Sequence, residues 1–91
     1  MPRPVATIGS LHTCPLHGGG PIVDPGQTHV TVGGLPVAVV GGACLCGGAG
    51  TDALVIGSTI VRIDGRAVVR MGDATMHGGV VTTGKPSVNV G

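Results

Sequence analysis

The sequence predicts a small all-β domain built from three hairpin repeats, and three observations lead to this prediction. Glycine and proline occur 19 and 7 times in 91 residues, a density at which no helix of ordinary length is stable. The large aliphatic residues are mostly β-branched, with fifteen valines and five isoleucines, which favours strands. One residue pattern also recurs every 31 or 32 positions. We expect one domain over residues 1–91, with no additional domain.

The first repeated element is a short strand that ends in glycine. Pro4–Gly9 reappears as Pro36–Gly41 and again as Ala67–Gly72, at spacings of 32 and then 31 residues. The alternation of small and β-branched residues in these segments is typical of strands with one buried face. Each copy therefore predicts one strand of a repeat.

The second repeated element is a strand followed by a two-residue turn. Gly26–Gly34 matches Gly57–Gly65, and a shortened copy, Gly84–Gly91, follows. The Gly33-Gly34 and Asp64-Gly65 pairs are strong signals for tight hairpin turns. Aliphatic residues two positions apart share one face of each strand, and we expect these faces to turn inward: Val30 and Val32, Val61 and Ile63, Val88 and Val90.

The two ends of the chain carry complementary halves of a repeat. The sequence opens on a second strand (residues 4–8) and closes on a first strand (residues 87–90). Pairing these two strands would complete the third hairpin and remove two free strand edges. We therefore expect a closed, conical or pyramidal arrangement in which the repeats are related by a pseudo-three-fold axis.

Histidine and cysteine gather in the loops that follow the first repeated element. His17, Cys46 and His77 each stand directly before a Gly-Gly pair, and Cys46 and His77 lie one repeat apart. A three-fold axis would bring these three loops to one point, and His12 or Cys14 could supply a fourth ligand. Four nitrogen or sulfur donors suit a structural zinc site. The spacing thus predicts a metal near the apex of the cone.

The other polar residues favour structural interpretations. In a plainer alternative, the loop histidines and cysteines only form hydrogen bonds within glycine-rich turns. His29 occupies the position of Ile60 in the repeat, so we interpret it as a surface residue. Cys44 corresponds to His12, so one of the two is a spare. The four aspartates are interpreted as turn or loop residues.

Composition narrows the possible functions. The chain has no aromatic residue, five basic residues and a net charge of +1, so it lacks the stacking residues and basic patches that bind nucleic acids. No apolar run reaches the ~20 residues that span a membrane. Residues 1–10 do not resemble a signal peptide. We expect assembly in the cytoplasm without a signal peptide, followed by export through another route.

The ordered set of motifs resembles the PAAR-repeat family, named for a Pro-Ala-Ala-Arg segment before Gly-Asp. The segment is present in altered form at residues 4–7, 36–39 and 67–70, and the Gly-Asp pair survives as Gly72-Asp73. The family's His-Gly-Gly turn occurs at His17 and His77. The resemblance covers nearly the whole chain.

The resemblance implies a structural tip protein rather than an enzyme. It would cap and sharpen the trimeric, valine-glycine-repeat-type β-helical spike of a type VI secretion system or related contractile machine, with one copy per trimer. It implies a structural Zn²⁺ held by three histidines and one cysteine, which map here to His12, His17, Cys46 and His77. Toxin effectors are further candidate partners, and neither nucleic acid nor a small-molecule substrate is expected. The alternative is a free-standing zinc-binding or thiol-redox module.

Overall fold

A computed structural model describes residues 2–15, 18–47 and 50–91 of the chain. The described residues form ten short strands and no helix, so the all-β prediction is confirmed. The strands are β1 (Arg3–Val5), β2 (Leu11–His12), β3 (Gly20–Asp24), β4 (Thr31–Val32), β5 (Leu35–Pro36), β6 (Ala43–Leu45), β7 (Thr51–Ala53), β8 (Arg62–Ile63), β9 (Arg66–Ala67) and β10 (Lys85–Val90). Within that part of the chain, no helix has the length and apolar character needed to cross a membrane.

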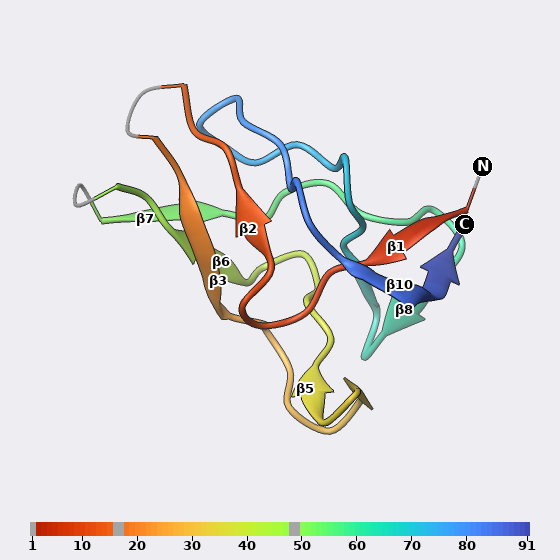
Figure 1. The fold of residues 1–91 in the computed structure, drawn as a ribbon. Helices are drawn as coiled ribbons and strands as arrows, with labels where there is room; N and C mark the ends of the chain where they lie inside the picture. The colour runs from red at the N-terminus through yellow and green to blue at the C-terminus, as the bar shows by residue number, and fades with distance from the viewer. Residues whose placement is uncertain (1, 16–17, 48–49) are drawn as a thin grey trace.

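The strands divide into one larger sheet and three two-stranded ribbons. The larger sheet has the order β2-β3-β6-β7, and the ribbons pair β1 with β10, β4 with β5, and β8 with β9. In Figure 1 the larger sheet lies on the left, whereas β5, β8 and β10 lie toward the bottom and right. The molecule measures 29 × 26 × 22 Å. The conical shape and three-fold relation of the repeats remain predictions.

Both predicted hairpin turns are present. β4 and β5 pair in antiparallel register across Gly33-Gly34, and β8 and β9 pair across Asp64-Gly65. All four turn residues have positive φ, including Asp64 at 53°. Aspartate tolerates this left-handed backbone better than most residues do, which explains how it replaces a glycine here.

The two ends of the chain meet as predicted. β1 pairs with β10 in antiparallel register, with Arg3 opposite Val90 and Pro4 opposite Asn89. Figure 1 shows the two termini beside each other at the end of this ribbon. The third hairpin is therefore assembled from both ends of the chain, and each strand covers an edge of the other.

A closed ring of backbone hydrogen bonds joins the first element of the three repeats. Ala6 donates to Val69, Val69 donates to Ala38, and Ala38 donates to Ala6, each at 2.9 Å between nitrogen and oxygen. These residues occupy equivalent repeat positions, and all three are fully buried. Small side chains allow the three backbones to approach this closely. We call Ala6, Ala38 and Val69 the central ring.

Two aliphatic clusters pack around the central ring. One contains the ring residues with Ile22, Leu54 and Val81, which are again equivalent positions of the three repeats, and with Cys44. The other contains Val5, Val37, Val39, Val68 and Val90. The core is thus filled by aliphatic and small residues without any aromatic side chain, as the composition required.

Beside the second cluster lies an open apolar hollow of about 190 Å³. We call it the valine hollow, and each repeat contributes three of its lining residues: Val30, Val32 and Val37; Val61, Ile63 and Val68; Val88, Val90 and Val5. Three of the valines occupy equivalent positions and expose nearly equal fractions of their surface, 39% for Val30, 38% for Val61 and 37% for Val88. The inward-facing residues predicted from the alternation all line this hollow.

Candidate metal centre

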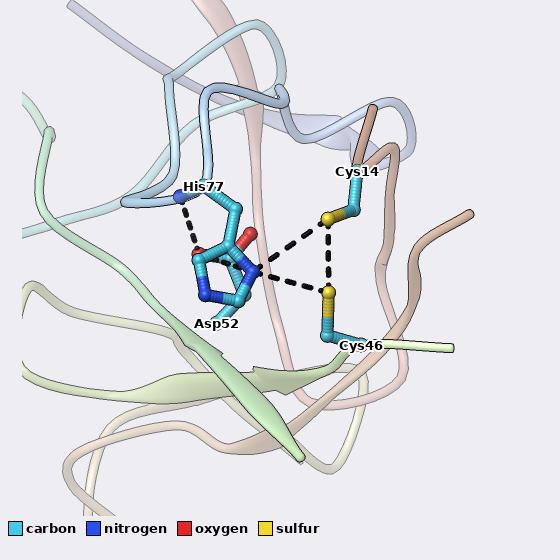
Figure 2. Close-up of side chains that lie close together, drawn as sticks. All are labelled: Cys14, Cys46, Asp52 and His77. Atoms are coloured by element: carbon cyan, nitrogen blue, oxygen red, sulfur yellow. Dashed lines mark hydrogen bonds and ion pairs between the residues drawn. The ribbon is translucent and has the colours of Figure 1, made fainter. Parts of the chain in front are cut away.

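Four side chains from three separate loops and one strand converge on a single point. Cys14 follows β2, Cys46 follows β6, Asp52 lies in β7, and His77 lies in the loop between residues 75 and 80. One ligand atom of each lies within 4.8 Å of the others. Figure 2 shows both sulfur atoms facing the Nδ1 side of the His77 ring.

The spacing of the three strongest donors suits a small metal ion. The two Sγ atoms are 2.9 Å apart, and His77 Nδ1 lies 3.6 Å from Cys14 Sγ and 3.2 Å from Cys46 Sγ. A tetrahedral ion with ~2.3 Å bonds to sulfur needs edges of roughly 3.8 Å between sulfurs. Moving the two sulfur atoms farther apart would therefore make room for a zinc ion between the three donors. Two thiolates and an imidazole are donors that zinc prefers.

Asp52 provides a carboxylate that is fully buried beside these donors. Its Oδ1 accepts a hydrogen bond from the His77 amide at 2.9 Å, and its Oδ2 accepts one from the Thr75 hydroxyl at 2.5 Å. Burial by itself raises the pKa of Asp52, but these two bonds and the nearby His77 and His12 rings lower it below its usual value. Asp52 therefore ties the His77 loop to β7.

His12 faces the other side of the same carboxylate. Its Nδ1 donates to the Gly20 carbonyl at 2.8 Å, and its Nε2 lies 3.1 Å from Asp52 Oδ2, with both side chains fully buried. Nε2 makes no well-aligned hydrogen bond among the described residues, so this contact is electrostatic. The Asp52 carboxylate therefore lies between the His12 ring and the His77 loop.

The structure brings together two of the four residues in the predicted ligand set. Cys46 and His77 lie within the group, and His17 lies outside the described residues. His12 lies outside the group and contacts its Asp52 carboxylate. In its place, Cys14 faces Cys46 and His77.

Repeat spacing contains the signal that identifies Cys14. Cys14 lies 32 residues before Cys46, and His77 lies 31 residues after it, so the three occupy one repeat position. The residue directly before the Gly-Gly pair of the first loop is instead His17, because residues 15–17 separate Cys14 from these glycines. His12, Cys44 and Thr75 likewise share one repeat position, and all three are buried.

The prediction that Asp52 is an ordinary turn or loop residue was wrong. Asp52 lies in β7, and its repeat equivalents are Gly20 and Gly79. A Cβ atom at Gly79 would collide with the Thr13 carbonyl, and one at Gly20 would lie 2.7 Å from the Leu45 carbonyl oxygen. Only the second repeat therefore has room for a side chain here. No periodic signal in the sequence marks such a position.

Burial raises the pKa of two of the buried thiols, Cys44 and Cys46. It raises the pKa of Cys44 to about 12, with further contributions from Asp52 and Cys46. It also raises the pKa of Cys46 to about 11, together with the Cys14 hydrogen bond. A bound cation would reverse this effect for Cys46 by stabilising its thiolate.

Comparison with known proteins gives one clear result. The family model of the PAAR motif matches residues 1–49 and residues 16–83, which together cover most of the chain. A search of curated proteins finds no match.

Proposed function

The chain belongs to the PAAR motif family, whose members have a spike-tip role in type VI secretion, and we propose that it caps the end of a trimeric β-helical spike. One copy would sit on each trimer, sharpen its point and assist membrane puncture. In this role the protein is a structural part of the machine. Export with the spike follows from the proposal.

The valine hollow is the observation that carries this proposal. It is lined only by aliphatic side chains, three from each repeat. Three equivalent strands of a trimer could each meet one repeat, although the cap itself is a single chain. Such docking would cover the exposed Val30, Val61 and Val88 and the open strand edges of the spike.

The candidate metal centre supports a mechanical role. Cys14, Cys46 and His77 each come from a loop of a different repeat, so an ion bound to them would join all three loops. A domain of this size has a small core and gains much of its stability from such a cross-link. We propose Zn²⁺ as the ion, because two thiols and an imidazole favour it.

The stoichiometry of the complex tests the capping proposal. The purified chain is mixed with the C-terminal β-helix of a trimeric valine-glycine-repeat spike, and the complex is weighed by native mass spectrometry. We expect one copy of the chain per trimer. Three copies per trimer, or no complex with any such spike, would contradict the proposal.

Two lysine variants locate the docking surface. Val61→Lys places a charge in the valine hollow, and we expect it to weaken spike binding by at least about 100-fold, because a lysine would be buried without a partner. Val55→Lys is the matched control, since Val55 is similarly exposed at 42% but lies outside the hollow. Equal losses in both variants would argue against docking at the hollow.

A thiol-redox function is the alternative, and one distance favours it. The Cys14 and Cys46 sulfurs are 2.9 Å apart, so a small movement would allow a disulfide. Both cysteines are buried, however, and the raised pKa of Cys46 disfavours the reactive thiolate in the metal-free protein. The capping function therefore agrees better with the site.

A further inference from the structure

A second surface lies on the side of the molecule, along the β8–β9 hairpin. It is an open groove of about 510 Å³ whose walls include Val55, Ile56, Arg62 and Arg66. None of its lining residues also lines the valine hollow. We propose that this groove binds an extended segment of a partner protein in which an acidic residue stands beside an aliphatic one.

The distribution of charge is the first support for this partner. The chain has four acidic residues, each has a partner of its own, and none of them lines the groove. Asp52 is buried in the candidate metal centre, Asp64 pairs with His29, and Asp73 pairs with Arg3 and Arg70. Asp24 accepts a hydrogen bond from the Gly26 amide in its own turn. Within the described residues, neither Arg62 nor Arg66 forms an ion pair with any of them.

Comparison between repeats shows what Arg66 lacks. Arg66 and Arg3 occupy equivalent positions, and each guanidinium lies against the glycine that ends a strand of another repeat, Gly41 and Gly72 respectively. At Gly72 the next residue is Asp73, and its carboxylate binds Arg3 at 2.9 Å. At Gly41 the next residue is Gly42, so the equivalent carboxylate is missing beside Arg66.

The fold prevents this carboxylate from being supplied at position 42. A Cβ atom at Gly42 would collide with the Asp24 carbonyl oxygen and lie 3.2 Å from the Leu54 side chain. An anion that pairs with Arg66 must therefore come from elsewhere. Arginine prefers carboxylate partners because its planar fork can donate two parallel hydrogen bonds.

The apolar wall of the groove indicates that the residue beside the acidic one in the partner segment is aliphatic. Val55 and Ile56 are adjacent residues that expose 42% and 48% of their surface, and both line the groove. An aliphatic side chain next to the acidic one could cover them while the carboxylate meets Arg66. Ile56 and Arg62 have no residue of the same kind at their equivalent positions (24 and 83, 31 and 89), so a partner bound here would select one side of the molecule, unlike a three-fold spike.

Peptide titration of the full, metal-loaded chain tests the proposal. The probe is a capped tetrapeptide of alternating glutamate and valine, and binding is followed by amide signals in NMR spectra of the ¹⁵N-labelled protein. We expect signals of residues 55–59 and 65–67 to shift. Glutamine in place of glutamate, or serine in place of valine, should weaken the shifts by about fivefold or more.

Two charge-matched variants distinguish the groove from general attraction to basic residues. Arg66→Gln should weaken binding of the acidic peptide by about fivefold or more, whereas Lys85→Gln removes one charge elsewhere and should change it by less than about twofold. No shift with the acidic peptide, equal shifts with the glutamine peptide, or equal losses in both variants would overturn the proposal. The two peptide outcomes are measured on the unaltered protein, so they do not depend on whether a variant folds. None of the three outcomes bears on the spike-capping proposal.

Discussion

At the scale of single residues, Asp52 holds parts of the candidate metal centre together through both of its carboxylate oxygens. Its two oxygens contact the His77 amide, the Thr75 hydroxyl and the His12 ring, which come from two different repeats. The molecule contains a second His–Asp pair, His29 with Asp64, in which both side chains are 60% exposed. The same pair of residue types therefore occurs in a buried and an exposed setting.

These two pairs predict very different effects of mutation. Asp52→Ala leaves the Thr75 hydroxyl and the His77 amide without their acceptor and removes the carboxylate beside the buried His12 ring, and we expect it to lower the free energy of unfolding by about 3 kcal/mol. Asp64→Asn, which keeps a residue suited to the positive φ of 53°, should cost less than about 1 kcal/mol. Denaturant unfolding of both variants measures this. A similar loss in the two variants would contradict the assignment of Asp52 as the buried acceptor.

The lowered pKa of Asp52 also predicts a pH dependence. Its stabilising contribution is complete above the unfolded-state pKa of about 3.9. As the pH falls below this value, the unfolded state takes up the proton first, so stability is lost toward the lower pKa of the folded state. The difference between wild type and Asp52→Ala should therefore shrink below about pH 4, and a constant difference would count against it.

At the scale of elements, the β4–β5 and β8–β9 hairpins have different side chains that accept hydrogen bonds from equivalent backbone amides. Gln27 Oε1 accepts bonds from the amides of His29 and Val30, and Ser58 Oγ accepts bonds from those of Ile60 and Val61. Gln27 and Ser58 share one repeat position. The hairpins themselves could be predicted from their turn residues. The shared capping role could not, because glutamine and serine have little in common as sequence signals.

The Ser58 cap predicts a local loss of stability. Ser58 is buried, and its hydroxyl also donates to the Gly91 carbonyl at 2.6 Å. Ser58→Ala should lower the free energy of unfolding by about 1–2 kcal/mol, because the bonded backbone groups lose their partner. Thr59→Ala removes the neighbouring, exposed hydroxyl and should change stability by less than about 0.5 kcal/mol. Thermal unfolding compares the two, and an equal effect would refute the cap.

At the scale of the whole molecule, the central ring and the candidate metal centre join the repeats at two different levels. The ring joins the first repeated element of each repeat through backbone bonds between Ala6, Ala38 and Val69. The centre joins three loops through the Cys14, Cys46 and His77 side chains. A metal would thus hold the part of the molecule that the aliphatic clusters do not reach, since of these three loop residues none belongs to either cluster.

Metal removal is expected to loosen this part of the molecule. A chelator should lower the melting temperature by about 10 °C or more, because a metal contribution of a few kcal/mol corresponds to such a shift in a domain of this size. Cys14→Ala should likewise lower the zinc content, measured by elemental mass spectrometry, well below one ion per chain. Cys44→Ala is the control, because Cys44 is as buried but lies outside the group.

A comparison with His12→Ala separates the two ligand sets. If Cys14 binds the ion and His12 only supports Asp52, the His12 variant keeps more zinc than the Cys14 variant does. A higher zinc content in the Cys14 variant than in the His12 variant would favour the ligand set that the family resemblance implies, namely His12, His17, Cys46 and His77.

The sequence by itself determined the hairpin elements and their order, whereas the β2-β3-β6-β7 sheet forms in segments where the repeat pattern predicts no strand. Turn residues such as Gly33-Gly34 and Asp64-Gly65 act locally, and the 31-residue spacing relates distant strands without any knowledge of their packing. The same spacing was enough to pair β1 with β10. It also placed Cys46 and His77 in one site, because equivalent positions in a repeat meet around a common centre.

Only the tertiary structure shows which other described side chains gather with Cys46 and His77. In the first loop, the repeat spacing points to Cys14 and the Gly-Gly pair points to His17, and a linear sequence cannot rank the two. Position 52 holds a side chain, whereas close backbone contacts exclude one from the equivalent positions, Gly20 and Gly79. Such room depends on how three loops of unequal length pack together. That property belongs to the folded molecule and not to any one segment.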